Sequence, residues 1–124
     1  MGLFDALMGN ASDADSKKVE EELREWLTAG EQVESAFKLY RDLMVFTNKR
    51  LIMIDKQGVT GKKVEYHTIP YRSISHYRVE TAGTFDLDSE LKIWVGSSAE
   101  PISKTFRNDD NIFDVQRALS KYVL

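Results

Sequence analysis

The acidic residues of one strand-like segment are the first candidates for chemistry. Asp86, Asp88 and Glu90 recur at every second position, so a strand would place all three carboxylates on one face. Paired carboxylates can act as general acid and base, and grouped carboxylates can bind calcium. A flat strand, however, cannot wrap around a cation as a glycine-bent loop does. We therefore interpret this row as a solvated or interface surface.

The two histidines are candidates for metal ligands. His67 and His76 fall in different predicted strands, and the sequence contains neither a His-x-His nor a His-Glu-x-x-His pair. The chain also has no cysteine, which excludes disulfides and thiolate metal sites. We expect each histidine to make an ordinary hydrogen bond, and we expect neither a metal nor a cofactor.

Two glycine-containing loops match catalytic motifs only in part. Gly58 and Gly61 are three positions apart, whereas a phosphate loop spaces its glycines by five and places Ser or Thr after its lysine. Residues 96–99, Gly-Ser-Ser-Ala, lack the second glycine of a nucleophile elbow. The sequence therefore predicts a protein that is not an enzyme.

Residues 86–95 form the strand that would position the acidic row. Apolar residues at odd positions, from Leu87 to Val95, predict a buried face, and charged residues at even positions predict an exposed one. Trp94 is the exception, because it lies on the charged face. We predict that this face meets another molecule and that Trp94 anchors the contact.

The same alternation extends over about 75 residues and predicts an antiparallel all-β core. The expected strands cover residues 33–39, 43–47, 50–55, 63–69, 75–81, 85–95 and 102–106. Seven short strands at this spacing predict a sandwich or a partly open barrel. The fold class is therefore mainly β with flanking helices.

A helix is predicted on each side of the strands. In the first, Val19, Leu23, Trp26 and Leu27 share one face, with Ser16 as the cap and Gly30 as the stop. The second starts after Asn108 or Asp109, and its apolar stripe would cover one open end of the strands. We therefore divide the chain into an N-terminal helical extension, 1–30, and a β domain, 31–124.

Charge is distributed unevenly along the chain. Residues 1–30 hold seven acids and three bases, for a charge of −4. Residues 38–63 hold seven bases and two acids, for +5, and residues 80–100 hold five acids and one base, for −4. This pattern favours a self-complementary surface, in which the acidic side of one molecule meets the basic side of another.

The overall composition limits the classes of function. The 124 residues fit one domain, and the net charge of −3 argues against nucleic-acid binding. No apolar run reaches the length of a membrane helix, and the first basic residue follows the first apolar cluster, so no secretory signal is expected. We expect a cytoplasmic protein.

Three parts of the sequence form a recognisable combination: RDLMVFTNKRLIMIDKQGVTGKK, IPYRSISHYRVETAGTFDLDSELKIWV and the C-terminal helix. Together they resemble a bacterial pleckstrin-homology family of small stand-alone proteins, formerly a domain of unknown function. The resemblance covers residues 17–124. It implies a pleckstrin-homology-like fold of two packed antiparallel sheets with seven strands, closed at one end by the C-terminal helix. It also implies cyclic homo-oligomers, with no enzymatic activity and no cofactor.

Binding of phosphoinositides is not expected, because the connection at Arg41-Asp42 is too short to surround a lipid headgroup. We expect a self-associating binding or scaffold module with a further, unidentified protein partner. The candidate interface pairs a basic group with an acidic strand: Lys49, Arg50, Lys62 and Lys63 with Asp86, Asp88, Glu90 and Trp94.

The alternative is a peripheral membrane module that inserts an N-terminal apolar segment and gains avidity from a ring. Its candidate contacts are Leu3, Phe4, Leu7 and Met8. This alternative is not favoured, because the segment contains Asp5 and lacks Lys and Arg, so anionic lipid would repel it.

Overall fold

The computed structural model describes residues 16–39, 42–57, 63–81, 83, 88–107 and 112–124. The elements follow in the order α2 (Ser16–Glu22), β1 (Val33–Lys38), β2 (Asp42–Thr47), β3 (Arg50–Gln57), β4 (Lys63–Pro70), the 3-10 turn η1 (Tyr71–Ser73), β5 (Ile74–Glu80), β6 (Ser89–Val95), β7 (Ile102–Phe106) and α3 (Ile112–Val123). The predicted order of helix, seven strands and helix is confirmed.

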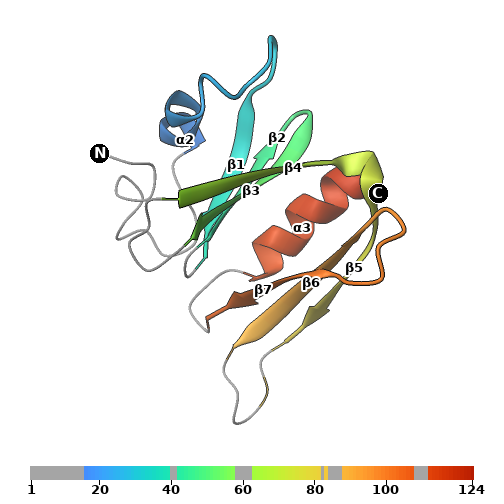
Figure 1. The fold of residues 1–124 in the computed structure, drawn as a ribbon. Helices are drawn as coiled ribbons and strands as arrows, with labels where there is room; N and C mark the ends of the chain where they lie inside the picture. The colour runs from blue at the N-terminus through green and yellow to red at the C-terminus, as the bar shows by residue number, and fades with distance from the viewer. Residues whose placement is uncertain (1–15, 40–41, 58–62, 82, 84–87, 108–111) are drawn as a thin grey trace.

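The strands form two antiparallel sheets that do not close into a barrel. Sheet A has the order β1-β2-β3-β4, and sheet B has the order β5-β6-β7. Every neighbour in a sheet is also a neighbour in sequence, so tight connections such as the predicted turn at Asn48-Lys49 are sufficient. Figure 1 shows α3 lying in the space between the two sheets.

The main hydrophobic core lies where both sheets meet α3. Sheet A contributes Phe46 and Leu51, sheet B contributes Leu91 and Ile93, and α3 contributes Leu119, all fully buried. The predicted dry face of β6 is therefore confirmed. Burial of these side chains, at about 2 kcal/mol each, holds the two sheets together.

A second core lies on the other face of sheet A. Leu43, Val45 and Ile54 point to this face, and Val19 and Leu23 of the N-terminal segment pack over them. Sheet A therefore carries apolar side chains on both faces, which explains the nearly unbroken apolar run of β2. The described part of the predicted extension 1–30 packs directly on the β domain.

The N-terminal helix differs from its prediction in three respects. It ends at Glu22, and Gly30 instead adopts φ +80° in the turn that leads to β1. Ser16 does not cap it; the Ser16 hydroxyl donates to the carbonyl of Glu34, at 3.4 Å. Trp26 is 53% exposed instead of buried with Leu23, because the chain has left the helix before reaching it.

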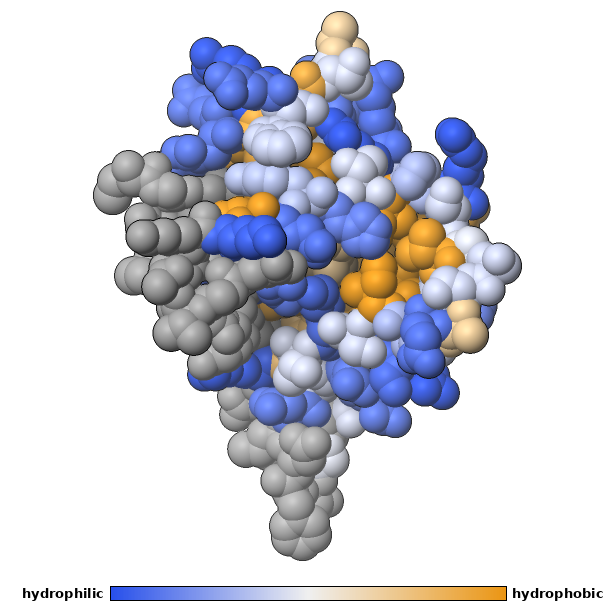
Figure 2. Space-filling view, in the orientation of Figure 1, coloured by the Kyte–Doolittle hydropathy of each residue, from blue (hydrophilic) through white to orange (hydrophobic). Residues whose placement is uncertain are grey.

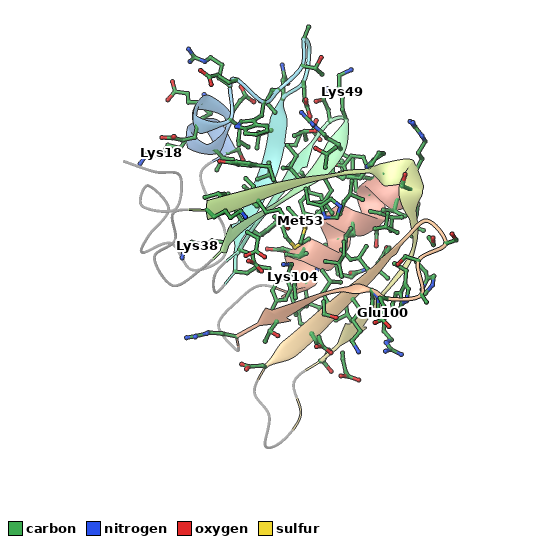
Figure 3. The ribbon with its side chains drawn as sticks, viewed as in Figure 1. Lys18, Lys38, Lys49, Met53, Glu100 and Lys104 are labelled. Carbon is green, nitrogen blue, oxygen red and sulfur yellow. The ribbon has the colours of Figure 1, made fainter. Side chains whose placement is uncertain are left out.

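Ion pairs and hydrogen bonds join the two sheets and α3 at their polar margins. Lys104 of β7 donates to Asp42 of β2 at 2.8 Å, and Figure 3 shows Lys104 between the sheets. The hydroxyls of Tyr77 on β5 and Ser120 on α3 lie 2.7 Å apart. Within the described ranges, no helix is both long and apolar enough to cross a membrane.

Candidate interaction surface

The outer face of sheet B carries the strand face that the sequence analysis singled out. Cross-strand pairing places His76 opposite Trp94, Arg78 opposite Lys92, and Glu80 opposite Glu90. Paired residues of an antiparallel ladder share a face, so these six side chains form one surface, which we call the Trp94 surface. It faces away from the main core, because the alternate residues Leu91 and Ile93 are the buried ones.

Trp94 is the aromatic centre of this surface. The His76 ring stacks on the Trp94 indole, with ring centroids 4.4 Å apart and planes 20° apart. The guanidinium carbon of Arg78 lies 5.7 Å from the indole centroid, within the range of a cation–π contact. The indole is therefore half-buried by polar neighbours that also hold its orientation.

The far end of the Trp94 surface is acidic. Glu80 and Glu90 are directly opposed across β5 and β6, where like charges repel. Glu90 is compensated in part by Lys92, at 3.5 Å. An open hollow lies beside them, lined by Glu80, Thr81, Gly83, Asp88, Ser89, Glu90 and Thr105. This end suits a cationic group of a partner.

The acidic row differs in detail from its prediction. β6 begins at Ser89, so Asp88 precedes the strand and reaches the hollow from the connection between β5 and β6. Asp86 lies outside the described residues. Within the described ranges, no group of His, Asp and Glu side chains is arranged to hold a metal ion.

The predicted basic group is divided between the two ends of sheet A. Lys49 and Arg50 lie at the β2–β3 turn, whereas Lys63 starts β4 opposite Gln57. The intervening length of β4 separates the two ends by about 24 Å. Lys49 and Lys63 are exposed, and Figure 3 shows Lys49 at the extreme end of sheet A. Lys62 lies outside the described residues, as do Leu3, Phe4, Leu7 and Met8.

Arg50 makes several contacts within its own chain. Its guanidinium donates to both carboxylate oxygens of Glu31, at 2.9 and 3.1 Å, to the carbonyl of Trp26 and to the hydroxyl of Thr68. The Glu31 side chain is fully buried. Burial by itself opposes ionisation of Glu31, but the hydrogen bonds from Arg50, Thr28 and Thr47 outweigh it and lower the pKa of Glu31. Arg50 thus anchors the N-terminal segment to sheet A.

Sequence reasoning missed His76, Arg78 and Glu31 as members of these arrangements. His76 and Arg78 alternate along β5, which was a visible signal, but their contact with Trp94 depends on the register between β5 and β6. That register includes a shift between Ile74 and His76, which no pattern in the sequence predicts. No sequence pattern pointed to Glu31, because it lies in a turn and its partner, Arg50, follows 19 residues later.

Known proteins resemble this chain along nearly its whole length. The family described as Bacterial PH domain matches residues 2–123. Two Bacillus subtilis proteins, both uncharacterised, are similar: YjqA is 58% identical, with 97% of each chain covered, and YozO is 34% identical, with 99% of this chain and 98% of YozO covered.

Two solved structures have the same fold. A pleckstrin homology domain from Shewanella amazonensis is 52% identical, with a TM-score of 0.84 and 99% of each chain covered. A DUF1696 family protein with a pleckstrin-homology domain from Shewanella loihica is 45% identical, with a TM-score of 0.81 and 94% of this chain and 99% of that chain covered. The resemblance seen in the sequence is thereby confirmed, and the chain belongs to the bacterial pleckstrin-homology domain family.

Proposed function

We propose that this protein is a non-enzymatic binding module that self-associates through the Trp94 surface and presents a protein-binding face on the resulting assembly. The family supports the coarser part, because the pleckstrin-homology fold generally serves binding and not catalysis. The observation that carries the finer part is Trp94 itself. A tryptophan with His76 on its ring and Arg78 nearby, on a face turned away from the core, is an anchor typical of interfaces.

Charge supports a head-to-tail arrangement. The Trp94 surface ends in Glu80, Glu90 and the acidic hollow, while the exposed Lys49 and Lys63 lie on sheet A. Two different patches of one molecule would then meet, and such heterologous contacts close into rings when the rotation between neighbours allows it. Because Lys49 and Lys63 lie at opposite ends of sheet A, separate variants of the two lysines can identify the end that takes part.

Sedimentation velocity on the full chain tests this proposal. At tens of micromolar, the wild type should sediment as an assembly, and the Trp94→Ala/Glu90→Lys double variant should sediment as smaller species. Phe113→Ala is the matched control, because Phe113 is an exposed aromatic residue of α3 that does not belong to the Trp94 surface. Lys49→Glu and Lys63→Glu, measured separately, identify the basic end. A monomeric wild type, or an unchanged assembly in the double variant, would refute self-association through this surface.

A further inference from the structure

The two sheets have four edge strands, and three of them are protected against pairing. On β1, the Val33 N–H donates to Glu20 Oε1 at 2.8 Å, and the Glu34 carbonyl accepts from the Ser16 hydroxyl. β5 has a register shift between Ile74 and His76. β7 is only five residues long. Occupied backbone groups, bulges and short strands are the usual ways in which proteins block an exposed edge.

Among the residues that the structure describes, none of these protections is present on the fourth edge strand, β4. It is eight residues long and pairs with β3 in an unbroken register from Lys63 to Pro70. Within the described ranges, no backbone or side-chain group hydrogen-bonds to the free edge of β4. Its proline stands at the last position, where it does not interrupt the strand. With respect to the described residues, every second residue of β4 therefore presents its backbone donor and acceptor at a free edge.

The side chains of β4 define which strand would fit beside it. On the outer face of sheet A, Tyr66 packs against the 53% exposed Trp26, with ring centroids 4.2 Å apart. On the other face, Lys63, Glu65 and His67 are exposed. A matching strand needs apolar or aromatic residues on one side and, on the other, polar residues that complement Lys63, Glu65 and His67. β4 itself has this pattern.

We propose that the free edge of β4 pairs with β4 of a second copy, antiparallel, about a two-fold axis through Tyr66. This register opposes Glu65 to the partner's His67, twice in the dimer, and opposes Val64 to the partner's Thr68. It also brings the two Tyr66 side chains together, each beside its own Trp26. Centring the axis on Glu65 would oppose two carboxylates, which disfavours that register. The proposal does not depend on the Trp94 surface, because it uses an edge of sheet A and not the outer face of sheet B.

Cysteine cross-linking tests the register directly, because the chain has no cysteine of its own. In the proposed pair the two copies of position 66 lie within the Cα separation that a disulfide requires, whereas the two copies of position 68 are about 14 Å apart along the strands. Mild oxidation should therefore give abundant disulfide dimer for Tyr66→Cys and about tenfold less for Thr68→Cys, its control on the same face. Equal yields, or no dimer from Tyr66→Cys, would overturn the proposal.

A charge swap provides a second and independent readout. Glu65→Lys should weaken the β4-dependent dimer about tenfold, because two cross-strand contacts between a carboxylate and an imidazole are lost. Adding His67→Glu should restore the dimer, because each pair then joins opposite charges. Glu22→Lys, the same change at an exposed position of α2, should leave the dimer unaffected. Absence of rescue by the double variant would count against pairing of Glu65 with the partner's His67.

The two proposals can fail separately. The Tyr66→Cys cross-link should also form in the Trp94→Ala/Glu90→Lys background. It should likewise form if the wild type proves to have no Trp94-dependent assembly. Protection of β4 amides from hydrogen exchange only after addition of an unrelated strand peptide, without a Tyr66→Cys dimer, would assign the edge to a different partner and overturn self-pairing.

Discussion

Sheet A and sheet B use their two faces differently. Sheet A is covered on both faces, by the main core on one side and by Val19 and Leu23 on the other. Among the described residues, sheet B is covered on its inner face only, and its outer face is the Trp94 surface. Figure 2 shows hydrophilic residues over most of the visible surface, with apolar residues gathered between the two sheets. The comparison indicates that sheet A is the framework and sheet B the sheet with a face available to a partner.

An exposed face alone would not indicate a function, because antiparallel sheets commonly have one solvated side. The composition of this face is what distinguishes it. A sheet face that meets only water has no need of a tryptophan, whereas here the His76 ring stacks on Trp94 and Arg78 approaches it. Removing the side chains that cover sheet A should therefore lower the stability of the fold. Altering the outer face of sheet B should instead weaken assembly and leave stability nearly unchanged.

The largest expected effect is on the outer cover of sheet A. Leu23→Ala should lower the free energy of unfolding by about 3–5 kcal/mol, because Leu23 is almost fully buried over β-strand residues such as Ile54. Chemical denaturation measures this change. Thr105→Ala, on the exposed face of sheet B, is the control and should change stability by less than about 0.5 kcal/mol. A Leu23→Ala protein as stable as the control would mean that the outer cover of sheet A contributes little to stability, so that sheet A would resemble sheet B.

The next effect concerns the link between the N-terminal segment and sheet A. Arg50→Met should cost about 2–3 kcal/mol, because it leaves the buried carboxylate of Glu31 without its cation. Adding Glu31→Gln should recover part of this loss, since the buried charge is then removed. Thermal unfolding of the single and double variants measures both. If the double variant were no more stable than Arg50→Met, the buried charge would not be the cause of the loss.

The smallest effect is at the polar margin where β2 and β3 face sheet B. A hydrogen bond with Asp42, burial and the Asp42 charge raise the pKa of Asp55. The folded protein therefore holds this proton more tightly than the unfolded chain, and stability is lost as pH rises through the raised pKa. Asp55→Asn should stabilise the protein at pH 7 by less than about 1 kcal/mol, and the difference should shrink as the pH falls toward 4. A gain that is independent of pH would contradict this assignment.

The fold could be predicted from the sequence wherever local patterns decide it. Alternation identified Leu91 and Ile93 as inward-facing, and the turn at Asn48-Lys49 and the C-terminal helix followed from local signals. The end of the first helix at Glu22 could not be predicted in this way. The segment that follows is held by the tertiary contact between Arg50 and Glu31, not by helix propensity.

The candidate site could be predicted only in part, for a related reason. Trp94 was visible as the misplaced aromatic residue in a charged row. Its neighbours His76 and Arg78 lie more than fifteen positions away and reach it only through the register of β5 and β6. The distance between Lys49 and Lys63 likewise depends on the β3–β4 hairpin, which places residues close in sequence at opposite ends of a sheet.

Oxidative footprinting of Trp94 as a function of protein concentration tests the central claim most directly. Mass spectrometry would report the reactivity of Trp94 and His76 in dilute, dissociated protein and at tens of micromolar, with Phe113, an exposed residue of α3, as the internal reference. The account predicts that Trp94 and His76 become protected as the assembly forms, while Phe113 does not. An assembled protein in which Trp94 reacts as fast as in the dissociated chain would contradict it.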